Sequence, residues 1–346
     1  MNKLMDIIQE DAAKICEQID FSSLYGQSIL ITGASGLLGV SMVACLKHLL
    51  ENDSAPMKVY AVTQSNLLPY QSHFFTHPNI TLFQGNLTDF QFCKSLPVAD
   101  NIIHAAGYAQ PARFMENPIE TMRLNTSTTF SLFEKLLPQG KFLFISTAEV
   151  YSGLTSLLHR ESEIGTTTTT HPRACYIEAK RCAEAICNSY RAAGIDAKSA
   201  RLALAYGPGT KPGDKRALNA FIEKGLNGQI TMLDHGLAKR TYCYVADAVE
   251  ILWDILLFGQ EPIYNVGGDS RTTIAELAQQ IGDTLNVPVV FPASSTESQG
   301  APDDVQLDMS LVRNAFGKTT FMPFETGLAR TIEWQQALYE SLVPIG

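Results

Sequence analysis

The sequence predicts an α/β fold: a doubly wound parallel sheet followed by a smaller α+β lobe. Two observations lead to this prediction. A short apolar strand ends in three regularly spaced glycines, ILITGASGLLG at 29–39, and short strands then alternate with helical stretches through the first half of the chain. Such alternation is typical of parallel sheets covered by helices on both faces, which bind ligands at the carboxyl ends of their strands.

Composition limits the class of protein. The chain has 346 residues, of which 45% are apolar, enough for two domains or one large α/β unit. A net charge of −9 disfavours a nucleic-acid or anionic-membrane partner, and seven scattered cysteines without a CxxC pair indicate neither disulfides nor a metal site. Residues 1–21 lack the features of a signal peptide. We therefore expect a cytoplasmic protein without metal.

The expected elements follow in order. Apolar spacing at 3–19 predicts a packing helix, and the first strand at 29–32 leads into a helix at 37–50. Further strands are expected at 58–62, 80–83, 101–104 and 141–146. A threonine-rich loop at 165–172 precedes another helix. The expected organisation is a helical extension at 1–24, a cofactor-binding domain at 25–206 to which 237–266 returns, and a substrate-binding lobe made mainly of 207–346.

The glycine motif points to a dinucleotide. Gly33, Gly36 and Gly39 are spaced so that the chain can turn tightly and bring its backbone against a diphosphate. The helix that begins at Leu37 would direct its free N–H groups and its dipole at the phosphates, so no cationic side chain is needed. The alternative is that the glycines serve only close packing of helix on strand.

Tyr176 and Lys180 form the second motif. They lie four residues apart on a predicted helix, so both side chains project from one face. A nearby ammonium favours the phenolate, which would make Tyr176 a general base for a substrate alcohol. Thr147, at the end of the strand at 141–146, could hydrogen-bond the same oxygen. Taken alone, a Tyr-xxx-Lys pair is also common as surface decoration.

In chain order, these motifs resemble the extended short-chain dehydrogenase/reductases that act on nucleotide sugars, the NAD-dependent epimerase/dehydratase group. The resemblance covers about residues 28–334. It rests on TGASGLLG (32–39), HAAG (104–107), STAEVY (146–151), YIEAK (176–180), YGPG (206–209), KRTYCYVAD (239–247) and YNVGG (264–268). It implies a Rossmann domain, a nucleotide-sugar substrate, and a homodimer formed through long helices at about 117–137 and 174–193.

The resemblance also implies roles for individual residues. Thr147, Tyr176 and Lys180 would be the catalytic set, joined by Glu149 as an acid/base, sugar-binding or structural residue. The residues expected to bind the cofactor are Gly33, Ser35, Gly36, Leu37, Gly39, Ala105, Ala106, Gly107, Asn125, Tyr176 and Lys180. Glu149, Arg216 and Arg240 are expected to bind the substrate, with the two guanidinium groups at its diphosphate.

The stretch from Arg173 to Tyr206 is most similar to UDP-glucuronate decarboxylases. Oxidation of the sugar at C4 to a 4-keto intermediate would be the common step, followed by decarboxylation or by 4-epimerisation. After Thr147, the dehydratases of the group have Asp-Glu and the decarboxylases Ser-Glu, whereas this chain has Ala148-Glu149, and 4-epimerases often carry alanine first. An NADPH-dependent 4-ketoreductase and a non-catalytic dinucleotide-sensing protein are the alternatives.

Three positions depart from the family pattern. The second strand is followed by Thr63-Gln64-Ser65 rather than by the acid that binds the adenosine ribose in NAD-preferring members. Asn86 replaces an aspartate near the expected adenine site, and Leu204 replaces a substrate-binding asparagine. NAD is the expected cofactor, NADP stays open, and substrate binding is expected to be altered.

Overall fold

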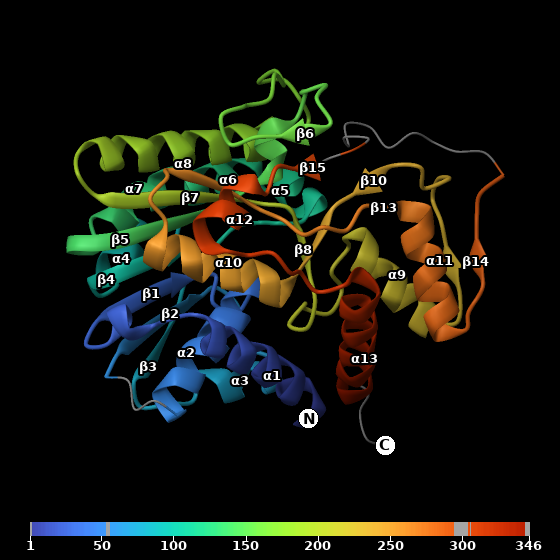
Figure 1. The fold of residues 1–346 in the computed structure, drawn as a ribbon, viewed down its shortest axis with the longest axis horizontal. Coiled ribbons are helices and arrows are strands. Elements are labelled where there is room, and N and C mark those ends of the chain that lie inside the picture. The colour runs from blue at the N-terminus through green and yellow to red at the C-terminus, as the bar shows by residue number, and fades with distance from the viewer. Residues whose placement is uncertain (1, 53–55, 294–303, 305, 343–346) are drawn as a thin grey trace.

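A computed structural model describes residues 2–52, 56–293, 304 and 306–342, and it is built around a seven-stranded sheet (Figure 1). The strand order is β12-β7-β5-β4-β1-β2-β3, and every neighbouring pair is parallel. The strands are β1 (Ser28–Thr32), β2 (Lys58–Thr63), β3 (Ile80–Gln84), β4 (Ala99–His104), β5 (Leu136–Thr147), β7 (Asp196–Leu202) and β12 (Ile263–Val266). The predicted doubly wound parallel sheet is confirmed, and the order reverses between β1 and β4, where such sheets bind their ligands.

Helices cover both faces of the sheet. α4 (Phe90–Ser95), α7 (Ser127–Phe133) and α8 (Ala174–Ala192) lie on one face, and α2 (Leu37–Asn52) and α10 (Val245–Phe258) lie on the other. Successive residues of β1 alternate between the two cores: Leu30 packs on the side of α7 and α8, while Ile29 and Ile31 pack on the side of α2. Both faces of the strand are therefore buried, which explains its unbroken apolar run.

The N-terminal helix α1 (Asn2–Gln18) packs outside α2 and against α13 (Phe324–Leu342). Its apolar stripe is buried, as the spacing predicts. Two polar contacts fix it further: the Trp334 indole donates to the Leu4 carbonyl at 3.1 Å, and Asp11 accepts hydrogen bonds from Tyr244 at 2.7 Å and from Arg330 at 2.9 Å. The helix thus joins the two ends of the chain.

The expectation of one long helix at 117–137 is wrong. Two short helices, α6 (Pro118–Asn125) and α7, take its place, and the chain has already entered β5 at Leu136. The helices are interrupted at Thr126, where the sequence runs Asn-Thr-Ser-Thr-Thr. These residues are weak helix formers whose side chains compete for the backbone, and the Asn125, Thr126 and Thr129 side chains each donate to a carbonyl four residues earlier.

The C-terminal lobe lies beside the carboxyl ends of the strands, at the right of Figure 1. It contains two helices packed on each other and short strand pairs: α9 (Ala217–Leu226), α11 (Ile274–Leu285), β9 (Ile230–Thr231) with β14 (Val289–Val290), and β10 (Lys239–Arg240) with β13 (Thr272–Thr273). The remaining elements are η1 (Ser22–Leu24), α3 (Pro69–Phe75), α5 (Pro111–Glu116), η2 (Ala148–Tyr151), β6 (Leu158–His159) with β15 (Gln306–Leu307), β8 (Leu204–Tyr206) with β11 (Tyr242–Tyr244), and α12 (Ser310–Phe316). The predicted α+β lobe is confirmed.

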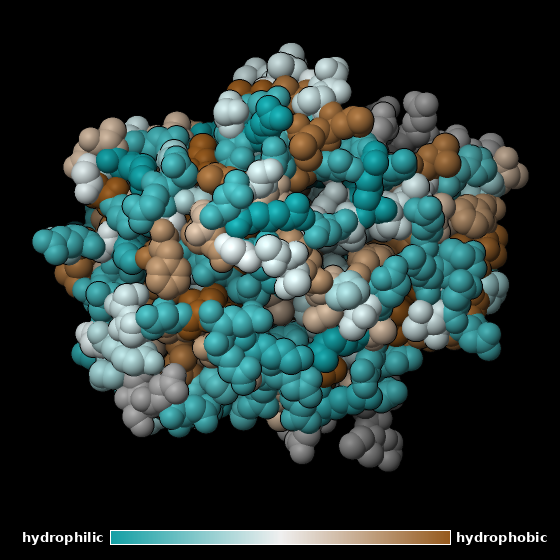
Figure 2. All heavy atoms as spheres, viewed as in Figure 1, coloured by the Kyte–Doolittle hydropathy of each residue, from teal (hydrophilic) through white to brown (hydrophobic). Residues whose placement is uncertain are grey.

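The surface over α1 and α12 is mostly hydrophilic, with small hydrophobic patches between (Figure 2). Within the described ranges, no helix combines the length and apolarity needed to cross a bilayer.

Candidate active site

A cavity of about 1100 Å³ lies between the carboxyl edge of the sheet and the C-terminal lobe. Most residues that the sequence singles out line it, namely Gly33, Gly36, Leu37, Gly39, Ala105, Gly107, Thr147, Glu149, Tyr176, Lys180, Arg216 and Arg240. Of these residues, those from Gly33 to Lys180 belong to the sheet and to the helices and loops that adjoin it. Arg216 and Arg240 belong to the C-terminal lobe. The motifs therefore meet in one place although they are far apart in the sequence.

The glycine loop is a close-packed turn between β1 and α2. Gly33 has φ +68°, and a Cβ there would lie 2.8 Å from the backbone of Ala105. A Cβ on Gly39 would lie 2.4 Å from the Gly33 carbonyl oxygen. Only glycine fits at these two positions, so the first turn of α2 comes directly against the loop and presents its N–H groups to the cavity.

A buried hydrogen-bond chain fixes the end of β4 behind this loop. Burial lowers the pKa of His104 to about 3, so its ring is neutral and carries one N–H. His104 Nε2 is 3.0 Å from the Leu124 carbonyl, which can only accept, so Nδ1 accepts from the Thr32 hydroxyl at 2.8 Å. Thr32 in turn accepts from the Ala106 N–H at 3.2 Å. The turn at 104–107 is thereby held against β1.

Thr147, Tyr176 and Lys180 come together at the end of β5. The Thr147 hydroxyl lies near enough to the Tyr176 hydroxyl to lower its pKa, and Lys180 Nζ donates to the Ile145 carbonyl at 2.7 Å. The ammonium lies 4.5 Å from the ring centroid of Phe144 and 5.8 Å from that of Tyr176. A substrate hydroxyl at this edge could therefore meet both hydroxyls at once.

Burial controls the protonation of both titratable groups. It raises the pKa of the Tyr176 hydroxyl to about 12, with the Glu149 charge adding to the rise and the Thr147 hydrogen bond opposing it. Burial lowers the pKa of Lys180 to about 7, while the negative charge of Glu184 opposes this fall. The sequence-based expectation that Lys180 lowers the Tyr176 pKa thus meets an opposing effect, because desolvation favours the neutral form of each group.

Glu149 is held by a residue that the sequence does not single out as functional. Arg173 donates to Glu149 Oε1 at 2.6 Å, and its guanidinium lies 5.4 Å from the Phe114 ring centroid. Phe114 stacks on Tyr176 with centroids 4.5 Å apart. Burial raises the pKa of Glu149, and the charges of Arg173 and Arg240 oppose that rise. The Glu149 carboxyl group is thus linked to Tyr176 through Arg173 and the Phe114 ring.

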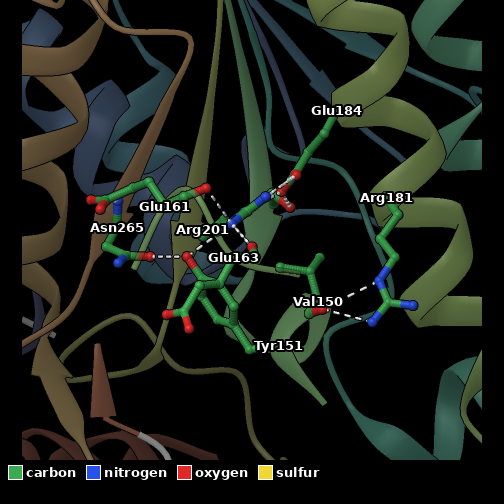
Figure 3. Close-up of polar contacts among 9 residues, drawn as sticks. Val150, Tyr151, Glu161, Glu163, Arg181, Glu184, Arg201 and Asn265 are labelled. Carbon is green, nitrogen blue, oxygen red and sulfur yellow. Dashed lines mark hydrogen bonds and ion pairs between the residues drawn. The ribbon is translucent and has the colours of Figure 1, made fainter. Parts of the chain in front are cut away.

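A buried ion pair supports the floor of the site (Figure 3). Arg201 on β7 and Glu184 on α8 are 2.8 Å apart, with their side chains only 3% and 4% exposed. Glu184 also accepts from the Ser146 hydroxyl at 2.5 Å, and Arg201 donates to the Tyr151 hydroxyl at 2.9 Å. Because Ser146 precedes Thr147 and Glu184 lies one turn beyond Lys180, the pair joins the two elements that carry the reactive groups.

Three expected cofactor-binding residues are not among those that line the cavity. The Ser35 hydroxyl accepts from Lys211, and the Ala106 N–H donates to Thr32. Asn125 is wholly buried and donates to the Thr121 carbonyl at 2.7 Å. Its Oδ1 has no hydrogen-bond partner in the described part of the chain.

The substrate side of the cavity is partly cationic and partly apolar. Arg216 forms an ion pair with Asp214 at 2.7 Å, and Arg240 lies near enough to Glu149 to affect its pKa. Leu204, 37% exposed, contributes an apolar wall where the family pattern has an amide. Among the described residues, no His/Cys/Asp/Glu cluster could hold a metal ion.

Sequence reasoning missed Phe114, Arg173 and Lys211 as parts of the site. Arg173 lies one helical turn before Tyr176, so its spacing was a usable signal. Phe114 follows the HAAG motif by seven residues and Lys211 follows the YGPG motif by two, but only the tertiary fold stacks Phe114 on Tyr176 and brings Lys211 to the glycine loop.

Comparisons with known proteins agree with this architecture. Residues 29–267 match the model of the NAD dependent epimerase/dehydratase family. The chain belongs to this family. It is 28% identical over 308 residues to UDP-glucuronic acid decarboxylase 6 of Arabidopsis thaliana (87% of this chain, 86% of that protein), and 29% identical over 309 residues to UDP-glucuronic acid decarboxylase 1 of Danio rerio (88% and 72%).

Solved structures show the same fold. UDP-glucose 4-epimerase from Thermotoga maritima superimposes with a TM-score of 0.76 at 22% identity, covering 90% of this chain and 99% of that one. DesIV, a dTDP-glucose 4,6-dehydratase from Streptomyces venezuelae solved with NAD, gives a TM-score of 0.79 at 22% identity, covering 92% and 100%.

The site fits the family's cofactor. Gly33, Gly36 and Gly39 line the cavity without side chains, the buried Lys180 lines the same cavity, and the buried Asn125 Oδ1 has no hydrogen-bond partner among the described residues. NAD is the cofactor of this family. Gly33, Gly36 and Gly39 would hold its diphosphate, and Tyr176 and Lys180 would lie at its nicotinamide end.

Proposed function

We propose that this chain oxidises the C4 hydroxyl of a nucleotide sugar to a 4-keto intermediate, with UDP-glucuronate decarboxylation as the best-supported overall reaction. The observation that carries the proposal is the meeting of Thr147, Tyr176 and Lys180 at the glycine-lined end of one cavity. Both decarboxylase relatives named above align over most of the chain. When bound, NAD would accept the C4 hydride and later return it.

The chain's own groups would handle the protons. Thr147 would hydrogen-bond the sugar O4, and Tyr176, as the phenolate, would take its proton. The Lys180 ammonium would stabilise that phenolate. With a 4-keto group in place, the C5 carboxylate would leave as CO2, its bonding electrons passing to C5 and the adjacent ketone. Glu149 would supply the proton that C5 then needs. Arg216 and Arg240 would bind the substrate diphosphate.

Product analysis tests this directly. The protein is incubated with UDP-glucuronate and NAD, and the nucleotides are identified by mass spectrometry. Formation of a UDP-pentose with release of CO2 supports the decarboxylase. UDP-galacturonate would identify a 4-epimerase, the outcome that Ala148 favours. Oxidation of NADPH in step with reduction of a 4-keto sugar would identify a ketoreductase. Binding of nucleotides without any conversion would favour the sensing protein.

We also propose that the chain forms a homodimer through α6 and α8. Ile119 and Met122 on α6 and Phe130 on α7 are large apolar side chains that are 69%, 44% and 50% exposed, and α6 packs along α8. Light scattering should give twice the chain mass, and Ile119→Glu should convert the dimer to a monomer.

A further inference from the structure

The end of β2 lies beside the glycine loop, where dinucleotide-binding folds of this type meet the ribose of the adenosine half. In enzymes that use NAD, an acid at this place binds the ribose hydroxyls, and its charge repels a 2′-phosphate. Here β2 ends at Thr63, and Gln64 and Ser65 follow. The next acid along the chain is Asp89, which caps α4. No nearby residue of this segment would therefore oppose a phosphate.

A lysine from a distant segment occupies this place. Lys211 follows the YGPG motif, 176 positions after Ser35 in the chain. Its Nζ donates to Ser35 Oγ at 3.1 Å and to Ser65 Oγ at 2.8 Å. One ammonium thus bridges the glycine loop and the end of β2. Both hydroxyls that it contacts can also donate, because a hydroxyl can turn its proton toward another acceptor.

The charge of Lys211 is not balanced locally. Within the described ranges it forms no ion pair, and its polar side-chain contacts are the two serine hydroxyls. Burial lowers its pKa, and the Arg113 guanidinium lowers it further. The Thr63 hydroxyl, 2% exposed at the end of β2, has no partner among the described residues. A bound anion would stabilise a partly buried cation that has a second cation nearby and no carboxylate beside it.

We propose that Lys211, Ser35 and Ser65 form a binding site for the 2′-phosphate of NADP, so that this chain accepts NADP as well as NAD. A phosphate offers several acceptor oxygens at one point, which matches one ammonium and two hydroxyls converging there. The 2′-hydroxyl of NAD would use the same serines without needing the ammonium. The inference rests on the proposed function only in requiring that a dinucleotide is bound.

Calorimetric titration of the full chain, freed of nucleotide and without any sugar, tests the proposal. We expect NADP to bind at least as tightly as NAD, and adenosine 2′,5′-bisphosphate to bind more tightly than 5′-AMP. Lys211→Met should weaken NADP and the bisphosphate by about 10- to 100-fold, the loss expected for one charge-assisted contact, and NAD by less than about threefold. Ser65→Asp should reverse the preference. Lys58→Met, at the opposite end of β2, is the matched control and should change neither affinity.

Two results would overturn the proposal. One is wild-type protein that binds NAD tenfold or more tighter than NADP. The other is a Lys211→Met variant that is folded by circular dichroism and loses affinity for NAD and NADP by the same factor. Lys211 would then contact a part of the cofactor that NAD and NADP share. If that variant does not fold, Ser65→Ala at the exposed end of the site carries the test, and it must weaken NADP more than it weakens NAD. Because no sugar is present, these results are independent of whether the proposed decarboxylation occurs.

Discussion

Arg173 holds only one of the two carboxylate oxygens of Glu149. The guanidinium donates to Oε1 at 2.6 Å, while Oε2 is buried without a hydrogen-bond partner in the part of the chain that the structure describes. A buried carboxylate oxygen left unpaired is costly, and it favours the protonated form of the acid. The pair therefore anchors Glu149 beside Tyr176 while one oxygen stays available for a proton or a sugar hydroxyl.

Glu149→Gln separates the roles open to this residue. If Glu149 supplies a proton after C4 oxidation, the variant should still oxidise C4, because Thr147, Tyr176 and Lys180 are intact, and the absorbance of reduced nicotinamide should build up in a single turnover. A residue that only orients the sugar would give a raised KM without this signal. Lack of accumulation at saturating substrate would contradict the acid/base role.

Arg173→Met tests the same pair from the other side. The charge of Arg173 opposes the rise in the Glu149 pKa, so its loss should raise that pKa further. Any limb of the pH profile of kcat/KM that reflects Glu149 should then move to higher pH. Arg191→Met, at the far end of α8, is the matched control. An unmoved profile in a folded Arg173→Met variant would remove Glu149 from the titrating groups.

Tyr176→Phe should abolish most turnover while leaving the fold and NAD binding nearly unchanged. The variant keeps the ring that stacks on Phe114 and removes only the ionisable hydroxyl. Loss of a general base lowers turnover by about 10²- to 10⁴-fold. The measurement is kcat beside a titration with NAD. A kcat within tenfold of wild type would exclude Tyr176 as the base.

Glu184→Gln should be strongly destabilising. The substitution leaves the Arg201 guanidinium buried without its carboxylate, which costs about 3–5 kcal/mol in comparable buried pairs (Figure 3). The double variant Glu184→Gln/Arg201→Met removes both charges and should recover much of the loss in urea unfolding. The matched control is Glu178→Gln, which breaks a more exposed pair with Arg181 on the same helix. Equal losses in the two single variants would contradict a special role for burial.

Much of the fold could be predicted because its signals are local. The apolar run before Gly33 and the four later strands depend on residues that follow one another in the sequence, and each lies within a strand of the sheet. The helix expected at 117–137 was wrong because the family resemblance supplied its length, whereas the Asn-Thr-Ser-Thr-Thr run of this chain has weak helix propensity. Propensity and side-chain competition interrupt the helix at Thr126.

The candidate site likewise contains some residues that local sequence signals predict and others that only the fold brings together. Thr147, Tyr176 and Lys180 could be found because their spacing and their place after β5 carry the information. Arg173 on Glu149 and Lys211 on Ser35 and Ser65 are contacts between segments 24 to 176 residues apart. No spacing rule joins such segments, since the fold alone decides which side chains meet. The burial that moves the Lys180 pKa to about 7 is likewise a tertiary property.

Asp254 on α10 should make stability depend on pH. Burial, and then the charge of Glu250, raise its pKa to about 7, while Lys318, which bonds Asp247 and Glu250 at 2.8 and 2.7 Å, opposes the rise. In the unfolded chain an aspartate has a pKa of about 3.9. Between these two pKa values the folded protein keeps a proton on Asp254 that the unfolded chain has lost. The contribution of Asp254 to stability is therefore complete below about pH 4 and is lost as the pH rises to about 7. Asp254→Asn should therefore match wild type in thermal unfolding near pH 4 and exceed it near pH 8. A difference that stays constant across this range would show that the substitution acts through packing rather than through charge.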